Sequence, residues 1–154
     1  MKVSTRSTYA IRALTDLGVR SQKGPVRLAE IARQQHIPLP YLEQIFYKLK
    51  KAGLVRAVRG PQGGYQLTKN PSDISLAEII TVLEGPLAPV LCSMPENYSP
   101  HCHEVDGCAS RFLCSELDGE LHRILAKNTV GMLCENMLRL VQKPIRFNME
   151  RSPA

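Results

Sequence analysis

The sequence lacks any run of apolar residues near the ~18 positions that a membrane-spanning helix needs. It also lacks an N-terminal stretch of charged and then apolar residues such as a secretion leader has. No glycine-rich phosphate loop ending in Lys-Ser or Lys-Thr occurs, and neither Gly-x-Ser-x-Gly nor His-Glu-x-x-His is present. These absences predict a cytoplasmic protein that is not an enzyme, with no membrane partner and no small-molecule substrate.

The 154 residues carry a net charge of +6, and this charge is unevenly distributed. Residues 1–83 hold 13 basic against 5 acidic residues (+8), whereas residues 84–154 hold 7 against 9 (−2). A basic front half favours contact with a polyanion, although charge alone leaves open a merely soluble basic face. The length supports one domain, or a small domain with an appendage, and a core that needs no disulfides.

Apolar residues in the first half recur at three- and four-residue steps, the helical period. They predict helices over residues 5–22, 26–35 and 40–51. Pro40 is well placed as the first residue of the third helix, and Gly53 stops that helix. The prolines at 38 and 40 disfavour helical conformation in the residue before each, so residues 36–40 are predicted to form a turn.

Two short extended runs, 54–59 and 64–68, follow the third helix and are joined by Gly60-Pro61-Gln62-Gly63. Glycine and proline between two extended runs indicate a β-hairpin. Helix, helix, turn, helix and a glycine-rich hairpin is the order of a winged helix-turn-helix, whose third helix enters the DNA major groove while the hairpin reaches the backbone or minor groove. The sequence therefore predicts a mainly α fold with a small two-stranded wing and double-stranded DNA as a partner.

The candidate DNA-contacting residues lie on the third helix and on the hairpin. Glu43 is suited to accept a hydrogen bond from cytosine N4, and Gln44 to read adenine. The basic residues would mostly hold phosphates, with Arg59 also able to enter a minor groove. An ordinary solvated helix face is the alternative. The full predicted set is Pro40, Tyr41, Glu43, Gln44, Lys48, Lys51, Arg56, Arg59 and Gly60.

The second half begins with Ser75-Leu76-Ala77-Glu78, a capping-box pattern that opens a fourth helix, which Gly85 closes. The helical period returns at about Phe112, in a stripe of apolar residues that is best buried against a second copy of the chain, so a long dimerisation helix and a homodimer are predicted. A further helix is predicted over 130–141. The stripe consists of Leu113, Leu117, Leu121, Ile124 and Leu125. The expected organisation is a DNA-binding domain over 1–85, a cysteine-bearing loop over 86–114, dimerisation helices over 115–142 and a frayed tail over 143–154.

Four of the five cysteines lie within one short span, and Cys102, Cys108 and Cys114 are separated by two equal five-residue spacers. Three thiolates on such a loop, with Gly107 among the intervening residues, are able to converge on a soft metal centre. An iron-sulphur cluster, zinc and a thiol switch each fit this spacing. The alternative is that cysteines pack as small hydrophobic residues, which suits a single cysteine such as Cys134 better.

The strings Pro40-Tyr41-Leu42-Glu43-Gln44 and Val58-Arg59-Gly60-Pro61-Gln62-Gly63-Gly64-Tyr65, followed by three cysteines five residues apart, resemble the IscR/NsrR-type bacterial transcription regulators. The resemblance runs from Met1 to about Met137. It implies a dimeric winged-helix protein that binds an operator in the bacterial nucleoid. It also implies an iron-sulphur cluster on Cys102, Cys108 and Cys114, with 2Fe-2S favoured over 4Fe-4S, as a sensor of iron, redox state or nitric oxide.

The fourth cluster ligand is where the chain departs from that family. IscR-like proteins have a histidine three residues after the last cysteine, but Leu117 stands there. NsrR-like proteins can use a carboxylate from the partner's first helix, but Thr8 occupies that position. The remaining candidates are a solvent molecule, the side chains of His101, His103, Cys92 and Glu116, and His36 of the partner subunit. A cluster-free regulator that uses thiols or zinc is the alternative function, and an electron-transfer iron-sulphur protein is a third.

Overall fold

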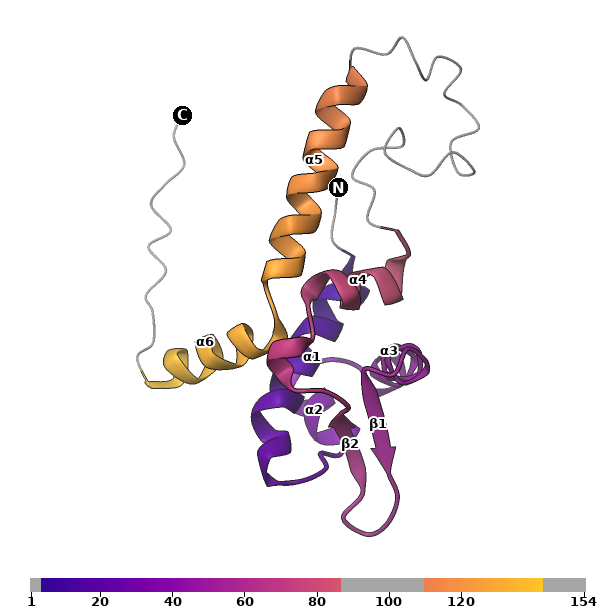
Figure 1. Ribbon diagram of the computed structural model, residues 1–154. Helices are drawn as coiled ribbons and strands as arrows, with labels where there is room; N and C mark the ends of the chain where they lie inside the picture. The colour runs from indigo at the N-terminus through magenta and orange to yellow at the C-terminus, as the bar shows by residue number, and fades with distance from the viewer. Residues whose placement is uncertain (1–3, 87–109, 143–154) are drawn as a thin grey trace, which may run out of the picture.

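The computed structural model describes residues 4–86 and 110–142, whose arrangement is shown in Figure 1. The helices and strands are α1 (Thr5–Arg20), α2 (Leu28–Gln35), α3 (Leu39–Lys51), β1 (Val55–Val58), β2 (Gly64–Leu67), α4 (Leu76–Glu84), α5 (Ser110–Lys127) and α6 (Val130–Gln142). Two short 3-10 turns, η1 (Ser21–Lys23) and η2 (Pro71–Asp73), follow α1 and β2.

Serine side chains cap the first turns of α1 and α4. Ser4 accepts a hydrogen bond from the Ser7 N–H at 3.3 Å, and Ser75 accepts one from the Glu78 N–H at 3.1 Å. Each bond satisfies one of the N–H groups that a first helical turn leaves without an intrahelical partner. Gly85, with φ of +89°, ends α4 in a conformation that a residue with a Cβ rarely adopts. The predicted start and end of α4, at Ser75 and Gly85, are therefore confirmed.

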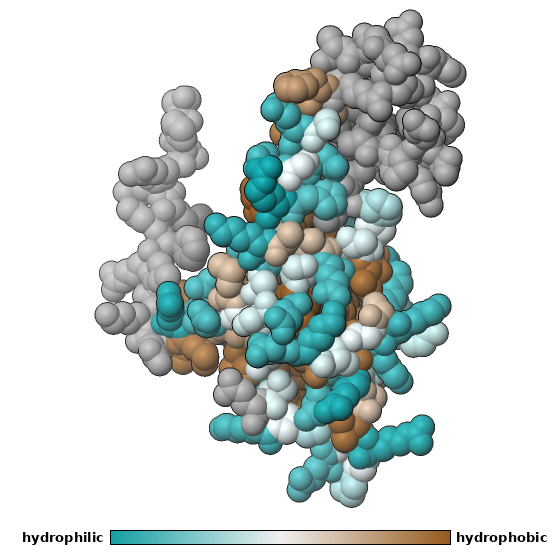
Figure 2. All heavy atoms as spheres, viewed as in Figure 1, coloured by the Kyte–Doolittle hydropathy of each residue, from teal (hydrophilic) through white to brown (hydrophobic). Residues whose placement is uncertain are grey.

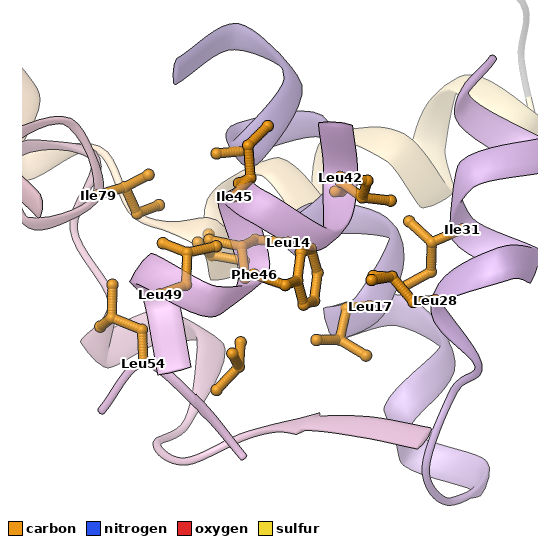
Figure 3. Packing of buried hydrophobic residues seen from close by; sticks show 14 of the residues in the cluster. Leu14, Leu17, Leu28, Ile31, Leu42, Ile45, Phe46, Leu49, Leu54 and Ile79 are labelled. Atoms are coloured by element: carbon orange, nitrogen blue, oxygen red, sulfur yellow. The ribbon is translucent and has the colours of Figure 1, made fainter. Parts of the chain in front are cut away.

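The hydrophobic core lies between α1, α2, α3 and α4, as Figure 3 shows. From α3 the side chains of Leu42, Ile45, Phe46 and Leu49 point inward, and each is at most 1% exposed. Burial of each such side chain stabilises the fold by ~1.5–3 kcal/mol. Their partners in the core include Leu14, Leu17, Leu28, Ile31, Leu54 and Ile79. With one face of α3 fixed in the core, the opposite face is held toward solvent.

The wing is an antiparallel pair of β1 and β2, in register from Val55 opposite Leu67 to Val58 opposite Gly64. It is tied to the body at Tyr65. The Val26 N–H donates to the Tyr65 carbonyl at 3.0 Å, and the Tyr65 N–H donates to the Val26 carbonyl at 2.8 Å. These two bonds fix the hairpin to the segment that leads into α2.

The C-terminal helices take two directions (Figure 1). Helix α5 projects from the body, whereas α6 packs against α1. The Val130 N–H donates to the Ile74 carbonyl at 2.9 Å, and Val130 and Cys134 both belong to the hydrophobic core. The Cys134 thiol donates to the Thr15 carbonyl at 3.4 Å. Burial, reinforced by the nearby charge of Glu135, raises the pKa of Cys134, so the buried thiol stays neutral.

The predicted fold class is confirmed: a mainly helical winged helix-turn-helix with a two-stranded wing, followed by C-terminal helices. Helix α3 begins at Leu39, one residue before Pro40, and α5 begins at Ser110, so Cys114 lies within α5. The reading of Cys134 as a small core residue also agrees with its burial. Across residues 4–86 and 110–142, no helix combines the length and apolar character needed to cross a membrane.

Gly64→Ala should destabilise the fold by about 1–3 kcal/mol, the usual cost of overpacking. An added Cβ would lie 2.4 Å from the Val26 carbonyl oxygen, and no side-chain rotation relieves a clash with backbone. Gly119→Ala is the matched control, because a Cβ there meets nothing within 4 Å and alanine is preferred in a helix by ~1 kcal/mol. Urea unfolding of both variants measures the difference, and wild-type stability of Gly64→Ala would contradict the tie between β2 and Val26.

Candidate nucleic-acid interface and cysteine segment

The outer face of α3 is formed by the residues on the side opposite its buried positions. Glu43, Gln44, Lys48 and Lys51 are exposed, and Tyr47 is 69% exposed. Pro40 is exposed at the first turn, whereas Tyr41 is half-buried. The predicted contact residues of the third helix are therefore brought together on one surface, with two side chains able to read bases beside two able to hold phosphates.

The turn between α2 and α3 has a special backbone conformation. His36 ends α2 with φ of +53° and ψ of +46°, and α3 follows after Pro38, which has no side-chain donor or acceptor to cap it. Arg12 of α1 reaches this turn and donates to Gln35 through two nitrogens, from Nη2 to the backbone carbonyl at 2.5 Å and from Nε to Oε1 at 3.3 Å. An arginine outside the helix-turn-helix thus holds the end of α2.

The wing carries the second group of predicted contacts. Arg56 and Arg59 are exposed, and Arg56 donates to the Gln66 side chain at 3.1 Å. The tip turns at Gly60, whose φ is +118°. Arg27, just before α2, donates to the Pro61 carbonyl at 2.8 Å and so holds the tip near the start of α2. Figure 2 shows mostly hydrophilic side chains over this end of the molecule.

The end of α4 is bound to the start of α1. It leads into the cysteine-bearing loop predicted over residues 86–114, here called the cysteine segment. The Glu84 carboxylate accepts hydrogen bonds from the Ser4 N–H, the Ser4 hydroxyl and the Ser7 hydroxyl. Arg6 also donates to the Leu83 carbonyl at 3.4 Å. Partial burial raises the pKa of Glu84, but the bonds from Ser7 and Ser4 and the charge of Arg6 outweigh it, so the net pKa lies below its ordinary value.

Of the predicted cluster ligands, Cys114 alone lies in the described ranges, and its side chain is buried in α5. Cys102 and Cys108 lie outside the described residues, as do the candidate fourth ligands Cys92, His101 and His103. Glu116 is exposed on α5, and His36 is exposed at the end of α2. Within 4–86 and 110–142, no three His, Cys, Asp or Glu side chains gather at a possible metal site.

The donor chemistry nevertheless fits an iron-sulphur centre. Three thiolates are the soft ligands that such clusters and zinc prefer. Leu117 follows Cys114 by one helical turn, so the two share a face of α5, and Leu117 is 50% exposed there without a donor atom. Leu117 therefore cannot supply a fourth ligand at this position.

A helix with exposed polar and basic side chains, next to a basic wing that is fixed to the body, defines a winged helix-turn-helix DNA-binding protein. Residues 3–136 match the model of the Rrf2 family, whose description is iron-dependent transcriptional regulator. The chain belongs to the Rrf2 family. It is therefore a DNA-binding transcriptional regulator, and the expectation that it is not an enzyme agrees with this membership.

Similar proteins cover most of the chain. The HTH-type transcriptional regulator IscR of Serratia proteamaculans is 37% identical over 154 residues, which are 100% of this chain and 92% of that protein. The structure of T. potens IscR has a TM-score of 0.72 at 34% identity and covers 89% of this chain and 88% of its own. CymR, the global cysteine regulator of B. subtilis, has a TM-score of 0.73 at 32% identity, covering 88% and 98%.

Sequence reasoning did not identify Arg12, Arg27 or Glu84 as residues that organise this surface. Arg12 and Arg27 are part of the positive charge of the front half, but charge counting does not show which arginine binds a carbonyl. Glu84 closes a predicted helix, and no local pattern links it to Ser4 and Ser7. The signal for all three exists only once the helices are packed.

Glu84→Gln should change the pH dependence of stability. Because the folded pKa of Glu84 lies below its ordinary value of 4.5, its charge stabilises the fold above that pH, and the contribution is lost as pH falls through the folded pKa. The stability difference between wild type and variant should therefore shrink as pH is lowered below about 4.5. Urea unfolding across the acid range measures it, with Glu30→Gln on exposed α2 as control. A difference that is independent of pH would contradict the Glu84 cluster.

Proposed function

We propose that the chain binds its operator as a homodimer through α3 and the wing, and that an iron-sulphur cluster on Cys102, Cys108 and Cys114 controls this binding. The observation that carries the DNA-binding part is the outer face of α3, where Glu43 and Gln44 are exposed beside Lys48 and Lys51. A carboxylate among phosphates is unfavourable unless it reads a base, so Glu43 points to direct base readout. A bacterial cytoplasm, at the nucleoid, is the corresponding location.

The proposed roles follow from the chemistry of each side chain. Glu43 accepts from cytosine N4 and Gln44 pairs with adenine, whereas Lys48, Lys51 and Arg56 neutralise phosphates. Arg59 at the exposed end of β1 reaches the backbone or a narrow minor groove. Pro40, Tyr41 and Gly60 supply close backbone and ring contacts. The bonds that hold Tyr65 and Pro61 to the body keep the wing at a fixed position relative to α3.

A second copy of the chain is the proposed partner of α5. This helix projects from the body, and Figure 2 shows hydrophobic side chains at its far end. Phe112 is 74% exposed, Leu113 is 57% exposed and Ile124 is 56% exposed. Large apolar side chains on a projecting helix are stabilised when a partner removes them from water. An antiparallel or crossed pair of α5 helices would relate the two recognition helices by a two-fold axis.

The cluster proposal is supported by three equally spaced cysteines and by membership of a family described as iron-dependent. When bound, an iron-sulphur cluster of the favoured 2Fe-2S type would supply a redox- and ligand-sensitive centre. The chain offers three thiolates as cluster ligands. The residue one helical turn after Cys114 is Leu117, which has no donor atom, so a fourth ligand is not supplied there. The fourth ligand is drawn from solvent or from His101, His103, Cys92, Glu116 or a partner's His36.

The proposed control acts through the two ends of the cysteine segment. One end, Glu84, is bound to Ser7 of α1 and to Ser4, which caps that helix, and the other end carries Cys114 on α5. Binding of one cluster by all three thiolates would restrict the distance between these ends. Because α5 is the proposed dimer helix, this restriction would bias how the two recognition helices are spaced across the dimer.

A cluster-free regulator that works through thiols, or through zinc, is the second candidate. The structural likeness to CymR supports it, because the Staphylococcus aureus CymR has a crystal structure in an oxidised form. The chain matches the oxidised form with a TM-score of 0.68 at 31% identity. A role in electron transfer has less support, since it gives the winged helix-turn-helix no use.

Substitutions on α3 and on the wing should affect DNA binding differently. Glu43→Ala should relax base preference with little change in salt dependence, whereas Arg59→Ala should weaken binding and reduce the slope of log affinity against log salt by about 0.9 for one lost phosphate. Lys127→Ala at the end of α5 is the charge-matched control for Arg59→Ala. Operators selected from random duplexes provide the test, and footprints should show two half-sites ~34 Å apart. Unchanged affinity and selectivity in both test variants would remove the helix-and-wing assignment.

Removal of any of the three cysteines should abolish cluster assembly. Protein purified without oxygen should be brown and contain iron and sulphide, and alanine at position 102, 108 or 114 should remove both, because each thiolate supplies a bond to iron that alanine cannot replace. Cys134→Ala is the control, since that thiol lies in the core against Thr15 and should not affect iron content. Colourless protein with bound zinc, or with no metal, would favour the second candidate. Equal operator affinity with and without the cluster would contradict the control mechanism but not the cluster.

A further inference from the structure

Three helices meet where the chain enters α3, and aromatic and cationic groups join them there. Tyr9 of α1 and Tyr41 of α3 contact edge to face, with ring centroids 5.9 Å apart and planes at 82°. The Arg12 guanidinium lies over the Tyr9 ring, 5.7 Å from its centroid. The same guanidinium binds both oxygens of Gln35 at the end of α2. Arg12 is thus the one side chain in this cluster that contacts both α2 and the ring against which α3 packs.

The bond from Arg12 to the Gln35 backbone has a physical reason. The last carbonyls of a helix have no intrahelical partner, and a positive charge is favourable at that end. Ala32 and Arg33 accept bonds from the backbone N–H groups of the following turn, whereas the Gln35 carbonyl accepts from Arg12. Arg12 therefore completes the end of α2 at the residue just before the left-handed His36.

The first turn of α3 depends on such external support. Its N-cap is Pro38, which makes no side-chain capping bond. Buried Leu42 fixes the helix from the core side, but Tyr41 is held by its contact with Tyr9. Glu43 and Gln44, the proposed base-reading residues, follow two and three positions later. A shift of this turn would move their side chains relative to the bases.

We propose that Arg12 is a positioning residue for sequence-specific DNA recognition: it fixes the angle at which the first turn of α3 leaves the α2–α3 turn. This inference rests on the proposed use of α3 as the reading helix. Arg12 itself contacts no base. The planar guanidinium is suited to the role, because it binds two oxygens in a fixed geometry and stacks on a ring, whereas the lysine ammonium is a point donor.

The test measures the ratio of affinity for a selected operator to affinity for a non-specific duplex. Arg12→Met keeps an unbranched apolar stem but removes the donors and the charge, and it should lower this ratio about tenfold, comparable to the loss of one base-pair contact. Arg33→Met is the matched control, because it removes one exposed arginine charge from neighbouring α2, and it should leave the ratio unchanged. The affinity for non-specific DNA should fall equally in both variants.

Equal loss of specific and non-specific affinity in Arg12→Met, or an unchanged ratio, would overturn the proposal and reduce Arg12 to a general cation. Arg12→Lys decides the matter if Arg12→Met does not fold: a ratio below wild type supports positioning, and a wild-type ratio overturns it. Gln44→Ala, measured in parallel, separates this inference from the assignment of α3. If Gln44→Ala changes base preference and Arg12→Met does not lower the ratio, the positioning role alone fails. If neither changes recognition, the assignment of α3 fails with it.

Discussion

The contact between Phe46 and Tyr65 is the point on which the arrangement of the two DNA-binding elements depends. The rings meet edge to face, with centroids 5.0 Å apart and planes at 80°. Phe46 belongs to the buried face of α3, and Tyr65 is the residue of β2 whose backbone pairs with Val26. Such a pair adds about 0.5–1.5 kcal/mol beyond the area that it buries. It also joins α3 directly to the wing, so the contact sets the position of one element relative to the other.

A set of longer-range bonds then fixes the edges of that body. Arg12 binds the turn before α3, and Arg27 binds the wing tip at Pro61. Glu84 joins the end of α4 to the start of α1. Each bond joins a charged group to a helix end or to a turn, where backbone or hydroxyl groups need a partner. The buried faces of the helices determine which elements pack together, and these bonds determine the orientation of their ends.

The sequence was sufficient to predict the order of elements because each carries a local signal. The helical period defines both faces of α3, the serine caps define the starts of helices, and the glycines define the hairpin between β1 and β2. Arg12, Arg27 and Glu84 gave no such signal, since their partners lie 23, 34 and 77 positions away in the chain. The return of α6 to α1 was not predicted either, because an amphipathic helix does not reveal whether its own module or a second copy covers its apolar face.

The place of Val130 and Cys134 in the core has a consequence for how the protein is made. Both residues lie after the cysteine segment in the chain, yet they pack among residues of α1 and beside Ile74. A ribosome releases the chain from its N-terminus, so the whole cysteine segment has left the exit tunnel before the core of the winged module is completed. All the cysteines from Cys92 to Cys114 have therefore left the ribosome before this core can close. Under the proposed cluster control, this order of synthesis would let each new molecule take up a cluster before it first binds an operator.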